Sequence, residues 1–390
     1  MTATVCGPCA AAVADQAQAL PDLPAGVPPL HSYYLYMSNS CNLACRHCWI
    51  TPRFVNGVPD PGDVIDVEAL RKAVQEGKTL GLSAAKLTGG EPMLHPRFLE
   101  IVALLTAEGL NLTMETNGTL LTAEHARYLK EASNVRFISV SIDGATPESH
   151  DSFRNVPGAF AAVVRGLDHL VAAGYDNVQV IMCPHHGNAH EVEAVVRLAV
   201  EHGAGSVKFN PITNSGRGQA MHARGEAFDF DEHLAFARYV RTELQDQTPI
   251  PVMTMTPPAL TSMQELWRTG GETGDCGVRG ILGMLGTGEI ALCGIGRTIP
   301  ELVYGRLGQD SIRDIWLHHP MIAQMRRALD DYRSFPGICG QCVHAKTCLT
   351  GCVANNYADS GALIAPQPLC AEAVRRGVFP ESRRRRDGDR

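Results

Sequence analysis

The sequence predicts an α/β protein: a partial (β/α)6 TIM-like barrel followed by a cysteine-rich, metal-held domain. Three observations predict this class. Between residues 33 and 211, short apolar runs alternate six times with helical patterns. The chain has 390 residues, more than one domain usually contains. Seven of its 13 cysteines follow residue 275, where apolar periodicity is weak, as it is in domains that metals stabilise.

Six short apolar runs are expected to form parallel strands, because a helical pattern separates each run from the next. They are Tyr33–Met37, Ala85–Leu87, Leu112–Glu115, Phe137–Ile142, Val178–Met182 and Val207–Asn210. In barrels of parallel strands the chemistry lies at the carboxyl ends of the strands. Polar residues that follow these runs are therefore the first candidates for a functional site.

The predicted helices have recognisable ends. Asp66 is expected to cap one helix at its N-terminus, and glycines such as Gly109 and Gly174 are expected to close others. The helices are expected at Val67–Leu80, at Phe98–Glu108, from Thr122 onward, at Ala159–Ala173, at Glu191–His202 and, beyond the barrel, at Asp231–Leu244.

Changes in apolar periodicity, proline content and cysteine content along the chain predict five segments. We expect an N-terminal extension at residues 1–30, the barrel at 31–230, a connecting helix and linker at 231–270, the cysteine-rich domain at 271–375 and a basic tail at 376–390. A hairpin is expected over Ile281–Leu292, turning at Gly286–Gly288. The four arginines at 383–386 are expected in a solvated, frayed tail rather than in a docking patch.

Composition limits the partners of this chain. It has 34 Lys and Arg residues against 41 Asp and Glu residues, a net charge of −7, so no basic surface indicates nucleic acid. No apolar stretch approaches the ~20 residues that span a bilayer, and residues 1–30 lack the pattern of a signal peptide. A cytoplasmic enzyme is expected, whose 13 cysteines serve metal binding or redox chemistry rather than disulfides.

Three cysteines after the first strand, Cys41, Cys45 and Cys48, have the spacing C-x3-C-x2-C. Three thiolates can hold an iron–sulfur cluster, but such clusters usually take four protein ligands, so one iron would remain open. A zinc site with His47 as its fourth ligand and ordinary buried cysteines are the alternatives. After the second strand comes the turn Gly89–Pro92, whose paired glycines let the backbone approach a ligand closely, although alone it is a common strand-to-helix turn.

Together, the triplet and the Gly-Gly-Glu-Pro turn resemble the radical S-adenosylmethionine (radical SAM) enzymes. The resemblance implies a [4Fe–4S] cluster on the triplet, with S-adenosylmethionine chelated at the open iron and cleaved to a 5′-deoxyadenosyl radical. It implies cofactor contacts at successive strand ends, from Gly89, Gly90, Glu91, Pro92, Thr116, Asn117, Ser141, Asp143 and Arg154. Backbone groups of the turn would bind the methionyl amino group.

Arg154 would bind the methionyl carboxylate, because a guanidinium is permanently charged and can bind both oxygens. The alternatives are turn chemistry for Asn117 and Asp143 and a surface ion pair for Arg154. The family usually has an aromatic residue before the third cysteine, where this chain has His47.

The C-terminal cysteines resemble the seven-cysteine SPASM domain, which carries auxiliary [4Fe–4S] clusters; zinc or chance spacing is the alternative. The resemblance assigns the first auxiliary cluster to Cys276, Cys293 and Cys352, and the second to Cys339, Cys342, Cys348 and Cys370. Several relatives have one more cysteine soon after the first, and this chain has none between Gly277 and Leu292. The first auxiliary cluster is therefore expected to have an open iron or to borrow a ligand, for which Cys6 and Cys9 are candidates unless they belong to a flexible tail.

The resemblance implies a net oxidation that begins with hydrogen abstraction, with an external electron donor such as flavodoxin or ferredoxin. We expect oxidative modification of a ribosomally synthesised peptide, by a crosslink or a thioether. The alternatives are a small-molecule or tetrapyrrole enzyme and a non-catalytic iron–sulfur electron carrier. Sulfatase-maturating relatives carry an aspartate where this chain has Gly294, which disfavours formylglycine formation.

Only about thirty residues precede the first strand, too few for a leader-recognition domain, so a peptide substrate is expected to need a separate carrier protein or another mode of recognition. Glu115, Lys208 and Asn210 lie near strand ends, and Arg217 lies on the loop above them. Each is a candidate acid, base or substrate anchor, although ion pairs that fill the barrel are equally expected.

Overall fold

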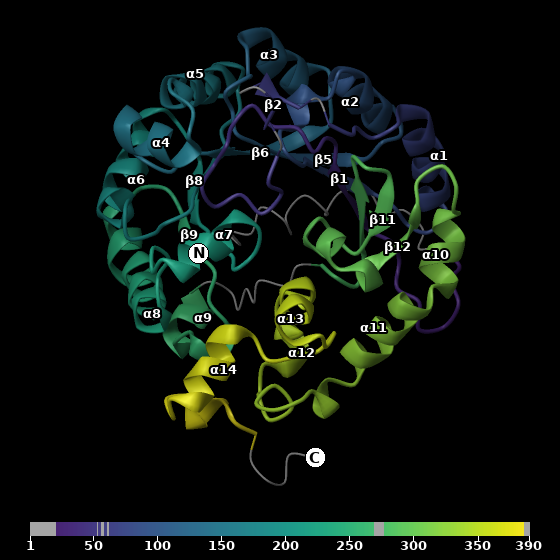
Figure 1. The fold of residues 1–390 in the computed structure, drawn as a ribbon, viewed down its shortest axis with the longest axis vertical. Coiled ribbons are helices and arrows are strands. Elements are labelled where there is room, and N and C mark those ends of the chain that lie inside the picture. Colours follow the sequence, from purple (N-terminus) through teal and green to yellow (C-terminus); the bar gives the residue numbers. More distant parts are fainter. Residues whose placement is uncertain (1–20, 53, 56–57, 61, 269–276, 386–390) are drawn as a thin grey trace, which may run out of the picture.

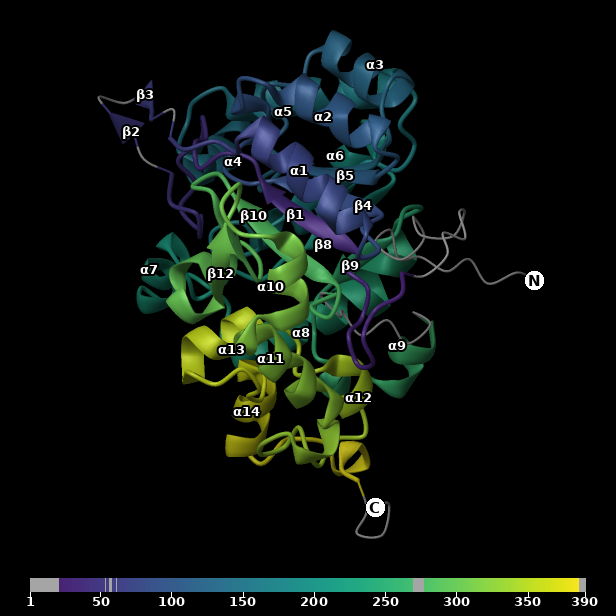
Figure 2. The same cartoon turned by 90° about the vertical axis from the view of Figure 1, so that its right-hand side faces the viewer.

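The chain forms an open barrel with a C-terminal helical layer beneath it. The computed structural model describes residues 21–52, 54–55, 58–60, 62–268 and 277–385. Figure 1 shows the strands on the inside of an open ring, with most helices of the first 240 residues around them. Figure 2, at a right angle to that view, places the helices after residue 319 below the barrel.

One ten-stranded sheet builds the barrel, in the order β12-β11-β10-β1-β4-β5-β6-β7-β8-β9. Its six central strands are parallel and coincide within one or two residues with the six predicted runs, which confirms the fold class. They are β1 (Ser32–Tyr36), β4 (Ala84–Thr88), β5 (Asn111–Thr116), β6 (Val135–Ser141), β7 (Gln179–Met182) and β8 (Ser206–Phe209). A small ribbon of β2 (Phe54–Val55) and β3 (Val58–Pro59) follows the cysteine triplet.

The sheet extends beyond the predicted barrel at both ends. The segment expected as a connecting helix and linker supplies β9 (Val252–Thr254), which pairs in parallel with β8. The predicted hairpin is present as the antiparallel strands β10 (Ile281–Leu285) and β11 (Glu289–Ala291), and β12 (Val303–Arg306) joins it. However, β10 also pairs in parallel with β1, so this part of the cysteine-rich region belongs to the barrel sheet.

The helices α1 (Val67–Lys78), α2 (Phe98–Ala107), α3 (Ala123–Glu131), α5 (Ala159–Ala172) and α6 (Val192–Glu201) lie outside the sheet, near their predicted positions. Asp66 caps α1 as expected, accepting a hydrogen bond of 2.7 Å from the Ala69 amide. Sequence patterns missed α4 (Pro147–Arg154) and α7 (Arg217–Ala223), because both are only two turns long and carry little apolar periodicity. A longer helix follows as α8 (Phe230–Tyr239).

The remaining helices are α9 (Met263–Arg268), α10 (Ile312–His318), α11 (Pro320–Asp330), α12 (Ala345–Cys348), α13 (Val353–Ser360) and α14 (Pro368–Arg375). Of these, α10 packs beside the barrel against α1, and α11 to α14 form the C-terminal layer. Trp316 on α10 is buried and donates a hydrogen bond of 2.9 Å to the Pro28 carbonyl, which ties α10 to the start of the described chain. Among the described residues, no helix is long and apolar enough to cross a membrane.

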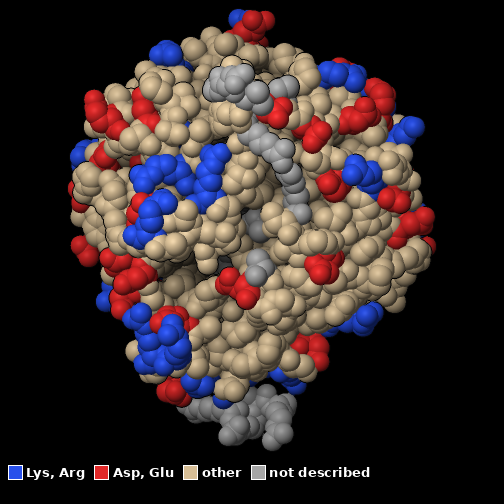
Figure 3. Space-filling model, in the orientation of Figure 1, with Lys and Arg blue, Asp and Glu red and all other residues tan. Residues whose placement is uncertain are grey.

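Part of the basic run near the C-terminus is packed rather than solvated, which differs from the expectation. Arg383 is 7% exposed, and its guanidinium donates a hydrogen bond of 2.8 Å to the Thr261 carbonyl. The Arg385 amide bonds to the Gln341 carbonyl. Figure 3 shows acidic and basic side chains interspersed over one face of the molecule, in keeping with the small net charge.

The two faces of the sheet differ in chemistry. Residues that face the outer helices, such as Leu87, Met114 and Val180, are completely buried. On the opposite face, the alternate residues are mostly polar and half-buried, as the period of two in a strand predicts. We call this inner surface the lumen face; strand register places on it Tyr34, Lys86, Thr88, Thr113, Glu115, Ser141, Ile181, Lys208 and Met253.

Candidate active site

The three cysteines of the triplet lie together in the loop that follows β1, at the carboxyl end of the barrel strands. Cys41 and Cys45 are each 6% exposed. Burial, the Glu91 carboxylate and the nearby Cys45 and Cys48 raise the pKa of the Cys41 thiol to about 12. Thiols that stay protonated in an apo protein bind metal only with release of protons, so iron has to displace those protons here.

Hydrogen-bond donors surround these sulfur atoms. The Leu43 amide lies 3.4 Å and the Asn117 side-chain amide 3.7 Å from the sulfur of Cys41. A guanidinium nitrogen of Arg154 lies 3.5 Å from the sulfur of Cys45. Donors of this kind stabilise thiolates and tune iron–sulfur clusters, so the residues present fit a [4Fe–4S] cluster.

His47 is turned to aromatic neighbours. Its ring stacks on Phe153, with centroids 4.7 Å apart and planes 2° apart, and Phe153 stacks in turn on His185 at 4.5 Å. Burial lowers the pKa of His47 to about 4, so the ring is neutral near pH 7. Among the described residues, no three His, Cys, Asp or Glu side chains converge closely enough to hold a single metal ion. The stack gives His47 the place of the family's aromatic residue rather than that of a zinc ligand.

The turn after β4 is fastened to the cysteine loop by its backbone. The Gly90 amide donates to the Ser38 carbonyl and the Glu91 amide to the Ser40 carbonyl, both at 2.8 Å. A Cβ atom at Gly90 would lie 2.0 Å from the Ser40 carbonyl oxygen, so only glycine fits this close approach. The paired glycines therefore position the two loops against each other.

Glu91 joins two strand ends from within the protein. Its carboxylate is completely buried and accepts hydrogen bonds from the Thr116 hydroxyl and the Asn117 amide, each at 2.8 Å, and from the Met93 amide at 3.2 Å. Burial raises its pKa to about 7. Pro92 is buried beside it and begins a short 3-10 turn. The side chains of Glu91 and Thr116 thus bond to each other and to neighbouring amides, and hold the two loops together. Any contact of these two residues with a cofactor is therefore expected from their backbone groups.

Arg154 and Asp143 form a buried ion pair at the next strand end. The Asp143 side chain is 0% and the Arg154 side chain 8% exposed. Burial by itself raises the pKa of Asp143, but the Arg154 guanidinium and two neighbouring histidines outweigh it and hold that pKa below its ordinary value. The alternative interpretation of Arg154, as part of an ion pair on the surface, is therefore wrong, because this pair is buried.

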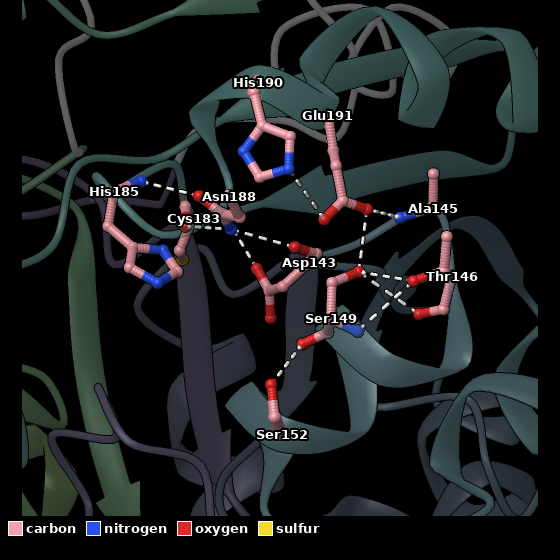
Figure 4. A network of polar contacts seen from close by, with 10 residues as sticks. All are labelled: Asp143, Ala145, Thr146, Ser149, Ser152, Cys183, His185, Asn188, His190 and Glu191. Carbon is pink, nitrogen blue, oxygen red and sulfur yellow. Dashed lines mark hydrogen bonds and ion pairs between the residues drawn. The ribbon is translucent and has the colours of Figure 1, made fainter.

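A network of polar contacts holds Asp143 in place (Figure 4). The Cys183 amide donates to its carboxylate at 2.7 Å, and the Asn188 side chain donates to its backbone carbonyl at 2.8 Å. Glu191 accepts hydrogen bonds of 2.7 Å from the Ala145 amide and the Ser149 hydroxyl at the start of α4. Because Arg154 ends α4, this network positions both partners of the ion pair. Sequence reasoning missed it, since its residues come from two segments far apart in the sequence, one after β6 and one after β7.

The remaining candidates divide between the lumen and the cysteine loop. Ser141 is half-buried at the end of β6, on the lumen face, and Asn210 follows β8. Arg217 was a candidate for the substrate side. Its guanidinium instead donates to the carbonyls of Cys45 and Pro52, at 3.0 and 2.9 Å. Arg217 therefore clamps the cysteine loop.

A second cysteine region lies directly beside the first. Burial and the nearby Cys293 sulfur raise the pKa of Tyr36, at the end of β1. The Tyr36 ring packs edge-on against Trp49 with centroids 5.7 Å apart. A Cβ atom at Gly294 would lie 2.2 Å from the Tyr36 ring and 2.4 Å from Trp49. These two rings fill the space that a side chain at position 294 would need, so an aspartate does not fit there with the rings in these positions.

Four of the C-terminal cysteines surround one cavity. Cys339, Cys342, Cys348 and Cys370 line one small cavity together with Pro257, Pro258 and Phe379. Burial raises the pKa of Cys370, and the other three thiols raise it further. Their place around one cavity fits the second auxiliary cluster. Cys352 caps α13, which packs against the turn that follows Cys293. Cys276, Cys6 and Cys9 lie outside the described residues.

Comparison with known proteins agrees with the geometry. A model of the Radical SAM superfamily matches residues 35–199. AdoMet-dependent heme synthase of Nitratidesulfovibrio vulgaris is 30% identical over 354 residues, covering 87% of this chain and 92% of that protein. Mycofactocin maturase MftC of Mycobacterium ulcerans is 26% identical over 340 residues, covering 86% of each chain.

Solved structures share the fold. Streptococcus suis SuiB bound to S-adenosylmethionine superposes with a TM-score of 0.67 at 14% identity, covering 88% of this chain and 77% of that one. Native anSMEcpe with bound AdoMet has a TM-score of 0.66 at 15% identity, covering 88% and 94%. The chain therefore belongs to the radical SAM superfamily, whose enzymes use a [4Fe–4S] cluster and S-adenosylmethionine.

Proposed function

We propose that this radical SAM enzyme oxidatively modifies a ribosomally synthesised peptide by forming a crosslink or a thioether. The observation that carries the proposal is the lumen face, which presents hydroxyl, carboxylate and ammonium groups directly below the cysteine loop. Such a surface suits a substrate rich in amide groups. A macrocycle would instead favour a largely apolar pocket.

Each loop at the strand ends would bind a different part of the cluster and of S-adenosylmethionine. Cys41, Cys45 and Cys48 would hold the cluster that, when bound, supplies the electron for cleavage of S-adenosylmethionine. Carbonyl groups of the turn Gly89–Pro92 would accept from the methionyl amino group. Arg154, already fixed by its ion pair, would bind the carboxylate with the nitrogen atoms that the pair leaves available.

The other strand-end residues complete the binding of the cofactor. Asn117 and the backbone at Thr116 would bind the adenosyl side, and Ser141 lies at the edge where the lumen meets this site. The radical would then take a hydrogen atom from a substrate lying against the lumen face. Removal of one further electron and one proton completes a two-electron oxidation of the substrate.

Cysteines of the C-terminal region would hold two auxiliary [4Fe–4S] clusters, which would supply a site for that second electron. The four cysteines that line one cavity, Cys339, Cys342, Cys348 and Cys370, support the second of them. Cys293 and Cys352, with Cys276, would hold the first. With this electron returned for the next cleavage of S-adenosylmethionine, no outside oxidant would be consumed, and an external donor such as flavodoxin or ferredoxin would only start the cycle. A cytoplasmic setting and a separate peptide-carrier protein complete the proposal.

Known proteins support a peptide substrate. Relatives include a mycofactocin maturase and the subtilosin biosynthesis protein AlbA of Bacillus subtilis. SuiB has been solved bound to its precursor peptide SuiA, and anSMEcpe with the Cp18Cys peptide. The filled space at Gly294 supports a product other than formylglycine, because a base cannot stand there.

The test is anaerobic turnover with iron-reconstituted protein, a chemical reductant and short peptides encoded beside its gene. We expect 5′-deoxyadenosine and a peptide lighter by two hydrogen atoms, both lost in C45A. A C370S variant should keep 5′-deoxyadenosine formation and lose the peptide product. Formation of no 5′-deoxyadenosine by the wild type would instead indicate an electron carrier.

A tetrapyrrole substrate is the second candidate, favoured by the 30% identity to AdoMet-dependent heme synthases over almost their whole length. Porphyrin tetracarboxylates in the same assay would lose carbon dioxide from a side chain. That product, with no change in any peptide, would replace the peptide proposal.

A further inference from the structure

The lumen face carries more positive than negative charge. A nitrogen–oxygen distance of 2.5 Å joins the Lys86 ammonium to the Glu115 carboxylate, and the Thr88 hydroxyl donates to the same carboxylate at 3.4 Å. The Lys86 side chain is 27% and the Glu115 side chain 39% exposed, so solvent or substrate reaches this pair from the lumen. Lys86 also lies over the Tyr34 ring, 5.2 Å from its centroid.

Lys208 faces the same space from the other side of the barrel. Its ammonium is close enough to help lower the pKa of Glu115, after Lys86. Among the described residues, however, no carboxylate lies within 4 Å of it, the distance of an ion pair. Its neighbours in register, Ile181 on β7 and Met253 on β9, are apolar. Two ammonium groups thus face one carboxylate, which leaves one positive charge in excess.

Lys208 lies close to the carboxyl ends of the barrel strands, where the proposed reaction would occur. It is in register with Ile181, which is in register with Ser141 at the carboxyl end of β6. Lys208 therefore stands one residue from the end of its own strand, on the lumen side and below the cofactor site. An anionic group held there would leave the adjoining part of the substrate at the strand ends, where hydrogen abstraction would occur.

We propose that Lys208 binds a carboxylate of the substrate. Lys86 stays paired with Glu115 and neutralises it, so that the charge of Lys208 remains available to the substrate. The inference rests on the proposed function only in placing the substrate in the lumen. The carboxylate could come from an acidic side chain of a peptide or from a propionate of a tetrapyrrole, and the chemistry of recognition is the same. An ammonium in a partly dehydrated lumen attracts an anion more strongly than one on an open surface.

The test measures equilibrium binding to iron-reconstituted, anaerobic protein, using two matched pairs of probes. One pair is a capped fluorescent hexapeptide that contains glutamate and its glutamine counterpart. The other is a porphyrin tetracarboxylate and its methyl ester. The wild type should bind the charged member of one pair at least about tenfold more tightly than the neutral member. The pair that shows this preference identifies the source of the carboxylate.

Variants with opposite expected effects make the test specific. K208M should abolish the preference, K208R should keep most of it, and E115Q should increase it, because E115Q raises the excess charge. K72M, on the exposed side of α1, is the matched control and should change nothing. Loss of affinity in E115Q equal to that in K208M would indicate general damage to the lumen and overturn the proposal.

An unchanged preference in K208M, or no preference for either charged probe in the wild type, would also overturn it. These measurements require no turnover. Failure of the carboxylate site is therefore distinguishable from failure of the proposed function, which 5′-deoxyadenosine formation and product mass report separately.

Discussion

Replacing Arg154 by methionine leaves the Asp143 carboxylate without its cation. An exposed ion pair contributes about 0–1 kcal/mol to stability. Removing one partner of a buried pair costs about 3–5 kcal/mol, because the remaining charge has neither water nor a counter-ion. The side chains of Asp143 and Arg154 are 0% and 8% exposed, which places this pair among the buried ones. R154M should therefore lower the free energy of unfolding by about 3–5 kcal/mol.

A double-mutant cycle separates the charge effect from lost packing. D143N keeps the arginine, and the double variant R154M/D143N contains no unpaired charge, so it should be more stable than R154M alone. Urea unfolding of all four proteins, anaerobic and iron-loaded, gives the coupling energy. A coupling energy below about 1 kcal/mol would mean that the pair behaves as an exposed one, and the reasoning from burial would be refuted.

The same pair predicts a dependence on pH. The folded protein holds the pKa of Asp143 below its ordinary value of 3.8, so the stability that the pair contributes is present above that pH and is lost as the pH falls through the lowered pKa. In R154M, burial should raise that pKa above its ordinary value, and the carboxylate then gains a proton as the pH falls. The stability deficit of R154M should therefore shrink from neutral toward mildly acidic pH. A deficit independent of pH would point to lost packing instead.

Three further predictions concern the loops and the clusters. G90A should destabilise the protein by about 1–3 kcal/mol and lower its iron content, because the added Cβ atom meets the Ser40 carbonyl oxygen at 2.0 Å; thermal unfolding and iron analysis measure both. G294D should disturb the first auxiliary cluster, and removal of the Tyr36 ring in the same protein should restore part of its electron paramagnetic resonance signal, since that ring lies 2.2 Å from the new Cβ atom. C370S should remove the iron of one cluster and leave the spectrum of the reduced S-adenosylmethionine cluster unchanged; loss of that spectrum as well would contradict separate sites.

Local patterns in the sequence predicted most of the barrel. Its central strands are short apolar runs, and helix ends such as Asp66 carry their own signals, so neighbours along the chain were sufficient. The strands β9 and β10 were assigned elsewhere because their partners lie far away in the sequence. All of Ile281–Leu285 is buried, and a run without alternation does not reveal which strand it will join.

The residues of the candidate site also fall into two groups, those that the sequence identified and those whose roles only the fold revealed. Motif spacing identified the cysteines and the paired glycines, because the residue types themselves carry the chemistry. The roles of individual polar side chains depended on contacts between loops: Glu91 bonds to the end of β5, and Arg217 clamps a loop more than 160 residues away in the sequence.

The sequence by itself determined that this chain builds a barrel with clustered cysteines at its strand ends, since both follow from short-range periodicity and spacing. Only the tertiary structure decided which charges are paired and which are not. Lys86 and Lys208 look alike in the sequence and both face the lumen, but the fold pairs Lys86 with Glu115 and, among the described residues, brings no carboxylate within 4 Å of Lys208. Ion pairing acts over a few ångströms in space, a distance that separation along the chain does not report.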